Sequence, residues 1–320
     1  MVPVYFAPME GVTDAVFRRV HHMCFSGVEG YYIPFISPTK HLVLTGREKQ
    51  NVLPEYNAGV PCIPQVLTCD AAHFLWAARL MAELGYTEIN LNAGCPSATV
   101  IAKGKGSGML RSAKELDAFL GHVCARSPLP VSVKTRIGFD SAEEWAALLA
   151  VYARYPLKRL IVHPRRRYER YDPGTIHGEC WAEACAGYPG ELVYNGELFR
   201  ASEVEALMKS GRGNGVMLGR GLVANPALAR QLNGGEALRK GELIRFHDLL
   251  AEEMQAAYKP EIAFMKLRVV MKHMACCFAD ADAHQMQIRC TRSMSELLAT
   301  DKALFSDCEL KDVPAFVPDA

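Results

Sequence analysis

The sequence predicts an α/β protein, a (β/α)8 TIM barrel followed by a small all-helical C-terminal domain. Three observations support this prediction. Eight short β-rich runs occur before residue 222, most are separated by segments with helical periodicity, and no convincing strand follows Pro226. Alternating strands and helices are typical of parallel β/α folds, and about 235 residues is an ordinary length for such a barrel. The expected strands are residues 2–8, 31–37, 62–68, 88–94, 130–138, 159–165, 191–197 and 215–221.

Helix starts are recognisable between these strands. Ser112 and Ser141 each precede a helical pattern, and a glutamate follows three residues after each serine. This spacing is a capping signature, because the serine oxygen accepts a hydrogen bond from a backbone N–H of the first turn. Pro34 interrupts the second β-rich run, since proline has no N–H for a strand ladder.

The periodicity changes after Pro226. We expect residues 1–235 to form the barrel and residues 240–320 to form the helical domain, with a glycine-containing linker at 233–242. We expect the last nine residues to form an irregular tail. Helical patterns occupy three segments, residues 242–258, 261–278 and 284–300.

Composition indicates a water-soluble intracellular protein. The chain has 320 residues, 22% of them charged, and a net charge of +1. No apolar run is long enough to cross a membrane, and the N-terminus lacks the pattern of a signal peptide. The eleven cysteines are odd in number and form no CxxC pair, which argues against a zinc site or a disulfide framework. We therefore expect a cytoplasmic monomer without a bound metal.

The stretch Glu88–Leu110 carries the clearest candidate for chemistry. An apolar strand leads into Asn92 and Cys95, and a glycine-rich loop follows. A cysteine in this setting is most often a small packing residue. As a nucleophile, Cys95 would need a partnered base, and no histidine motif adjoins it. A thiol with an ordinary pKa of about 8.5 is protonated near neutrality, so a general acid is the better hypothesis.

The order of several motifs resembles that of the tRNA-dihydrouridine synthases. The resemblance covers about residues 3–225 with specific motifs and the helical remainder more weakly. Two departures stand out: Asn90 replaces an acidic residue of many members, and Pro164-Arg165-Arg166 replaces Gly-Arg-Thr after His163. The motifs are FAPMEGVTD, INLNAGCPS, KGKGSGML, SVKTRIG, IVHPR, YNGE and MLGRG.

The resemblance implies an enzyme that reduces the C5–C6 double bond of specific uridines in tRNA. Reduced FMN would deliver the hydride and Cys95 would deliver the proton. NADPH would supply the electrons that reduce FMN. The absence of a Rossmann fingerprint fits a nicotinamide that visits the flavin and leaves. The residues expected to bind FMN are Pro8, Met9, Gln65, Lys134, His163, Asn195, Gly196, Glu197, Gly219 and Arg220.

A nearly neutral protein must bind tRNA through local clusters of basic residues. Such clusters follow the sixth strand, flank the Cys95 loop, and recur in segment 261–278, where we expect the cations to share one helix face. Any one of them is equally consistent with an ordinary solvated surface. The residues expected to bind tRNA are Asn92, Lys103, Lys105, Arg165, Arg167, Lys266, Arg268 and Lys272.

Two other functions remain open. The first is an FMN barrel that oxidises or reduces a free pyrimidine, although a small substrate needs neither the helical domain nor the arginine cluster. The second is a tRNA-binding protein that has lost its chemistry, against which the presence of Cys95, Lys134 and Arg220 argues. The sequence does not identify which uridine is modified.

Overall fold

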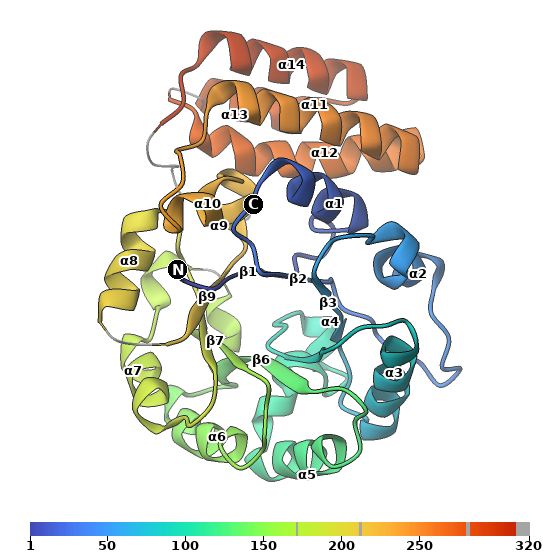
Figure 1. Ribbon diagram of the computed structural model, residues 1–320, viewed down its shortest axis with the longest axis vertical. Helices are drawn as coiled ribbons and strands as arrows, with labels where there is room; N and C mark the ends of the chain where they lie inside the picture. Colours follow the sequence, from blue (N-terminus) through green and yellow to red (C-terminus); the bar gives the residue numbers. More distant parts are fainter. Residues whose placement is uncertain (171, 211–212, 280–281, 312–320) are drawn as a thin grey trace.

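The computed structural model describes the chain except for residues 171, 211–212, 280–281 and 312–320, so the expected C-terminal tail lies outside the described residues. A ring of parallel strands lies inside a ring of helices, and four further helices pack along one side of the barrel (Figure 1). The strands are β1 (Val4–Phe6), β2 (Gly30–Tyr32), β3 (Cys62–Ile63), β4 (Gln65–Val66), β5 (Ile89–Ala93), β6 (Val131–Gly138), β7 (Leu160–Arg166), β8 (Leu192–Asn195) and β9 (Gly215–Leu218).

The barrel is closed, and Pro64 explains why nine strand segments make eight barrel strands. The hydrogen-bonded order runs from β3 through β2, β1, β9, β8, β7, β6 and β5 to β4. Its two ends, β3 and β4, are consecutive in the chain and are separated by Pro64 alone, which has no N–H to donate. The Pro64 carbonyl still accepts from the Asn90 N–H at 2.9 Å.

The predicted barrel and its eight strands are confirmed, although every strand except β7 is shorter than the run that predicted it. The largest difference is in the second run, where β2 ends two residues before Pro34. Beyond it, Ile36 forms only an isolated bridge to Val66. The early end of β2 and the isolated bridge both follow from Pro34, because proline has no N–H to donate to the backbone hydrogen bonds between strands.

The predicted helix caps are confirmed. The Ser112 side chain accepts from the Glu115 N–H, and Ser141 and Glu144 form a reciprocal capping box. The helices up to residue 232 are α1 (Ala15–Cys24), α2 (Gly46–Val52), α3 (Ala71–Glu83), α4 (Ala98–Ile101), α5 (Ala113–Cys124), α6 (Trp145–Tyr152), α7 (Gly178–Gly187), α8 (Ala201–Lys209), α9 (Arg220–Ala224) and α10 (Leu228–Leu232).

The C-terminal part contains four helices rather than the three predicted segments. They are α11 (Lys240–Ala257), α12 (Pro260–Met274), α13 (Asp282–Cys290) and α14 (Met294–Asp307). The last predicted segment is divided because Ser293 caps a new helix, its side chain accepting from the Glu296 N–H. This Ser-x-x-Glu signal was available in the sequence.

Helices α11 and α12 attach the helical part to the barrel. The Phe246 ring of α11 meets edge-on the rings of Phe17 in α1 and of Phe25 directly after it, with centroids 5.9 and 5.4 Å apart. On α12, Lys266 Nζ donates to Asp14 Oδ2 at the N-cap of α1. No helix in the described part of the chain is long and apolar enough to span a lipid bilayer.

Candidate active site

A pocket of about 420 Å³ opens at the C-terminal ends of the barrel strands, the usual position of an active site in this fold. Its walls contain all ten residues that the sequence assigns to FMN, together with Cys95 and Asn92. The structure therefore brings these residues together, while their individual roles remain predictions.

Cys95 is held by its neighbours at the end of β5. The Asn92 side chain accepts from the N–H groups of Gly94 (3.1 Å) and Cys95 (2.9 Å). The Ser107 hydroxyl donates to the Cys95 carbonyl at 2.9 Å. Gly106 has a φ of 58°, and a Cβ there would lie 2.9 Å from Cys95 Cβ. The glycine spacing thus lets the loop pack directly against the cysteine.

A row of side-chain hydrogen bonds continues from Asn92 into the barrel. Asn92 donates to Gln65 (2.8 Å), which donates to Asn90 (2.7 Å), and Asn90 donates to Ser132 (2.8 Å). Ser132 donates to Glu88 at 2.6 Å. Asn90 both donates and accepts in this row, as a side-chain amide can. Asparagine is therefore accommodated at this position, where the family resemblance leads one to expect an acidic residue.

Lys134 and Arg136 share the inner face of β6, since side chains two residues apart on a strand point the same way. Among the described residues, Lys134 has no carboxylate within ion-pairing distance, although it lines the pocket. Burial, and then the neighbouring Arg136, lower the pKa of Lys134 to about 7. The pocket therefore offers an ammonium group that a ligand oxygen can satisfy.

The Cys95 thiol is kept protonated by its surroundings. Burial raises its pKa above the ordinary thiol value, and this outweighs the opposing effects of a backbone hydrogen bond at Ser97 and of the Arg136 and Lys134 charges. A protonated thiol at neutral pH is a proton donor rather than a thiolate nucleophile.

His163 is neutral, and Arg165 fixes its tautomer. Burial and several surrounding cations lower the pKa of His163 well below its usual value. Arg165 Nη1 lies 2.9 Å from His163 Nε2. Because a guanidinium can only donate, Nε2 accepts and the proton of the neutral ring is on Nδ1.

The loops after β8 and β9 meet at one end of the pocket. A Cβ at Gly221 would lie 2.3 Å from the Leu198 carbonyl oxygen, so only glycine permits this approach. The Glu197 carboxylate pairs with both Arg165 and Arg220. Two guanidinium groups therefore lie at this end of the pocket, and guanidinium groups suit an anionic ligand.

The prediction that Arg165 contacts tRNA is wrong. Its side chain is fully buried. Besides His163 and Glu197, it donates to the Asp172 carbonyl and to the Thr175 hydroxyl. Its guanidinium therefore positions the residues behind the pocket and does not reach the surface.

The basic residues of α12 do not share one face, contrary to prediction. Lys266 binds Asp14 on one side, whereas Arg268 Nη1 donates to the Thr291 carbonyl at 3.0 Å on the other. Residues two apart on a helix are about 200° apart around its axis, which accounts for the error. Among the described residues, the half-exposed Lys272 has no ion-pair partner.

The basic residues predicted on the barrel rim differ in how far their charged groups are available to a ligand. Lys103 is exposed, while Lys105 Nζ donates to the Ser37 hydroxyl at 3.2 Å. Arg167 is partly exposed and pairs with Asp140 at 2.6 Å. Of this group, Lys103 is the one with its charge most open to solvent.

Several pocket residues were missed by the sequence interpretation. Arg136 could have been found, because it lies two residues after Lys134 on the same strand face. Phe35, Glu10 and Val269 carry no comparable local signal. Val269 and His273 of α12 also line the pocket, so the helical part contributes directly to the site.

Comparison with known proteins gives two findings on the chain's relatives. Residues 5–309 match the family described as dihydrouridine synthase (Dus). The chain is 28% identical to the tRNA-dihydrouridine(16) synthase of Pseudomonas putida, covering 95% of this chain and 99% of that protein. It is 26% identical to the probable tRNA-dihydrouridine synthase of Rhodobacter capsulatus, covering 96% of both proteins.

Solved structures support the fold. Morphinone reductase superposes with a TM-score of 0.55 over 74% of this chain and 87% of that one, at 13% sequence identity. At this identity the likeness concerns the barrel fold alone.

Proposed function

The chain belongs to the dihydrouridine synthase family, and we propose that it reduces specific uridines of tRNA to 5,6-dihydrouridine using FMN and NADPH. The observation that carries this proposal is the single pocket that holds Cys95, Lys134 and Arg220. A cytoplasmic location is part of the proposal, and the eleven free cysteines support a reducing compartment.

The residues of the pocket fit a flavin mononucleotide. A volume of about 420 Å³ lies in the range of small-molecule and cofactor sites. Within the described part of the chain Lys134 has no carboxylate partner, so it is available to the polar edge of a flavin ring. The guanidinium groups of Arg165 and Arg220 beside Glu197 suit the phosphate, and Gly196 and Gly219 would bring backbone groups close to it.

When bound in its reduced form, FMN would supply the hydride for carbon–carbon double-bond reduction. Lys134 would hold the polar edge of the ring, and the Nδ1–H of His163 is oriented as a donor by Arg165. Gln65 belongs to the hydrogen-bonded row that begins at Asn92, so its amide presents a fixed orientation to the pocket.

Cys95 would deliver the proton to the other carbon of the uracil. Its backbone is fixed by Asn92 and Ser107, which leaves the side chain to face the pocket. The raised pKa keeps the proton on sulfur until it is transferred. General acid catalysis of this kind contributes about 10²- to 10⁴-fold to the rate.

The proposal is tested with purified protein, FMN, NADPH and unmodified tRNA. We expect a yellow protein that NADPH bleaches and that tRNA reoxidises. Cys95→Ala should slow tRNA reduction by about 10²- to 10⁴-fold while NADPH still bleaches the flavin. Cys69→Ala is the matched control, because Cys69 is a second thiol at the same end of the barrel, with Sγ 3.4 Å from the Lys103 carbonyl.

Each rival function predicts a different result. A free-pyrimidine enzyme would turn over uracil or a related base faster than tRNA, and a binding protein without chemistry would not be bleached by NADPH. A wild-type protein that cannot be reconstituted with FMN would disprove the proposal. So would a Cys95→Ala variant that reduces tRNA at the wild-type rate.

A further inference from the structure

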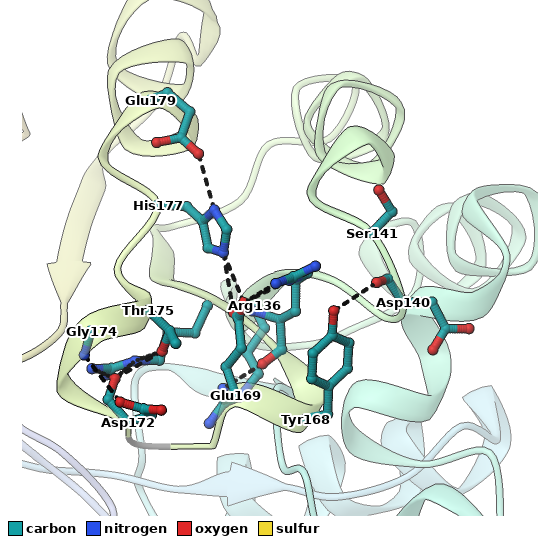
Figure 2. Close-up of polar contacts among 12 residues, drawn as sticks. Arg136, Asp140, Ser141, Tyr168, Glu169, Asp172, Gly174, Thr175, His177 and Glu179 are labelled. Carbon is teal, nitrogen blue, oxygen red and sulfur yellow. Dashed lines mark hydrogen bonds and ion pairs between the residues drawn. The ribbon is translucent and has the colours of Figure 1, made fainter.

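The loop between β7 and α7 is built around a buried carboxylate. The Glu169 side chain is only 4% exposed. It accepts from the Arg166 N–H at 2.6 Å, from Arg166 Nε at 2.7 Å, and it lies 3.0 Å from His177 Nε2. Figure 2 shows the His177 ring directed toward Glu169. Although burial opposes it, the hydrogen bonds from Arg166 and His177 lower the pKa of Glu169 to about 2, so the carboxylate is ionised at neutral pH.

Arg136 ties this loop to the active-site pocket. Its guanidinium donates to the carbonyls of Arg166 and Arg170, each at 2.9 Å, and to the Gly94 carbonyl at 3.0 Å. Arg170 has a φ of 46°, an unfavourable backbone conformation for a residue with a side chain. Since Arg136 also lines the pocket, its guanidinium links this loop to the end of β5 that carries Cys95.

Tyr168 projects from this braced loop. It is 51% exposed, one of the large hydrophobic residues that the fold does not cover. The Arg166 guanidinium lies 4.7 Å from the ring centroid, and the hydroxyl donates to the Asp140 carbonyl at 3.3 Å. In Figure 2 the ring extends from the loop toward Asp140. Both contacts restrict the ring before any ligand arrives, so little further entropy is lost on binding.

Two more arginines pack on Phe139, the residue before the Asp140 that Tyr168 contacts. Arg167 lies 3.9 Å and Arg111 4.4 Å from the centroid of the Phe139 ring, and Phe139 adjoins Asp140. We name Tyr168 with Arg166, Arg167 and Arg111 the Tyr168 platform. It combines an exposed aromatic ring with three cations, although Glu169 and Asp140 each neutralise one of them.

We propose that the Tyr168 platform binds an unpaired nucleotide of the substrate RNA next to the uridine that enters the pocket. The base would stack on Tyr168, and its phosphate would lie near the arginines. This inference rests on the proposed function, and it adds a second base-binding position outside the pocket.

General features of RNA recognition favour this partner. Proteins that bind single-stranded RNA stack bases on aromatic side chains and arginine planes, and they place basic groups along the phosphate chain. A uridine that leaves its stack to reach a deep pocket also exposes its neighbours. Holding one neighbour at the rim would keep the target base from returning to the stack.

The test compares three substitutions of Tyr168 with a matched control. Tyr168→Ala removes the ring, Tyr168→Phe removes only the hydroxyl, and Tyr168→Trp enlarges the stacking surface. Tyr56→Ala is the control, since Tyr56 is 39% exposed and lies between α2 and β3, outside the pocket lining. Dissociation constants for unmodified tRNA are measured at several salt concentrations, with flavin content and NADPH bleaching recorded for every variant.

We expect Tyr168→Ala to weaken tRNA binding by about 10-fold or more, the usual loss for one stacked base. Tyr168→Phe should stay within about 3-fold of wild type, and Tyr168→Trp should bind at least as tightly. The dependence on salt should not change for any of the three, because the ring carries no charge. Tyr56→Ala should match wild type in every measurement.

The inference is overturned if Tyr168→Ala binds tRNA as tightly as wild type. It is also overturned if Tyr168→Phe loses as much affinity as Tyr168→Ala, because the hydroxyl contact would then be responsible. Failure of the proposed function gives a different result, since the wild-type protein itself would then not reduce tRNA, whether or not it binds tRNA. Flavin content identifies any variant that fails to fold, and Tyr168→Trp tests the ring independently of truncation.

Discussion

The loop between β7 and α7 and helix α12 resemble each other in sequence but not in structure. Both carry closely spaced basic residues, and both were predicted to contact tRNA. At the end of β7, Arg165 is buried and Arg166 turns to Glu169, while Tyr168 in the loop that follows is exposed. On α12, Lys266 and Arg268 bind neighbouring elements. Three residues that α12 exposes form an apolar row, Ile262, Met265 and Val269.

The difference shows that basic residues close together in the sequence need not face solvent together, because the fold turns some of them toward internal partners. A guanidinium has five donors, and backbone carbonyls or a nearby carboxylate satisfy them readily. Arg165 is an extreme case, because its donors connect β7, β8 and the following loop. Such residues stabilise the walls of the site, and tRNA must be bound by the cations that remain.

The largest expected effect is the difference between the buried Arg165 and the partly exposed Arg167 in their contribution to the free energy of unfolding. Arg165→Met should lower the free energy of unfolding by about 3–5 kcal/mol, because it leaves the largely buried Glu197 with one partner fewer and the Asp172 carbonyl without its donor. Arg167→Met should cost less than about 1 kcal/mol, since its ion pair with Asp140 is exposed. Urea unfolding of both variants measures the difference. Equal losses would show that burial does not separate the two residues.

A smaller effect is expected where α12 meets the barrel. Lys266→Met should lower the free energy of unfolding by about 1–2 kcal/mol, because the ion pair with Asp14 is mostly shielded from water. A double-mutant cycle with Asp14→Asn isolates the pair from other effects of each substitution. A coupling energy near zero would show that the pair with Asp14 does not stabilise the protein, and Lys266 would then be counted with the surface cations.

The pH dependence of FMN binding tests whether the Lys134 ammonium, which lines the pocket, contributes to FMN affinity. The pKa of Lys134 is lowered from its usual 10.5 to about 7 in the free protein, so the ammonium is present below pH 7 and is lost as the pH rises above it. FMN affinity should therefore fall by up to about 10-fold between pH 6 and pH 9, by roughly the loss of one charged hydrogen bond. Lys134→Met should bind FMN weakly and without this dependence. A wild-type affinity that is constant over this range would contradict the assignment.

The smallest effect concerns individual contacts with the tRNA backbone. Each lost phosphate contact should reduce the slope of log affinity against log salt by about 0.7–0.9. We expect this reduction for Lys103→Gln and Lys272→Gln, whose side chains have no ion pair among the described residues. Lys266→Gln should leave the slope unchanged, because its charge is already used by Asp14. The opposite ranking would mean that tRNA displaces the internal ion pairs.

The sequence by itself determined the fold class and most of the pocket. Eight β-rich runs alternating with helices predict the barrel, and in a barrel the C-terminal strand ends converge whatever their spacing in the chain. This geometry brought Pro8, Gln65, Lys134, His163 and Arg220 together as expected. Local signals were also sufficient for the helix caps at Ser112 and Ser141.

Only the tertiary structure decided which charged groups reach the solvent and which hold the protein together. Arg165 and Arg167 are two residues apart with the same chemistry, and what separates them is the Glu197 and Asp172 that lie beside one and the exposed Asp140 that lies beside the other. The contribution of Val269 to the pocket likewise depends on how α12 packs against the barrel. Contacts between residues far apart in the chain are set by the packing of whole elements, and a local sequence pattern does not contain that information.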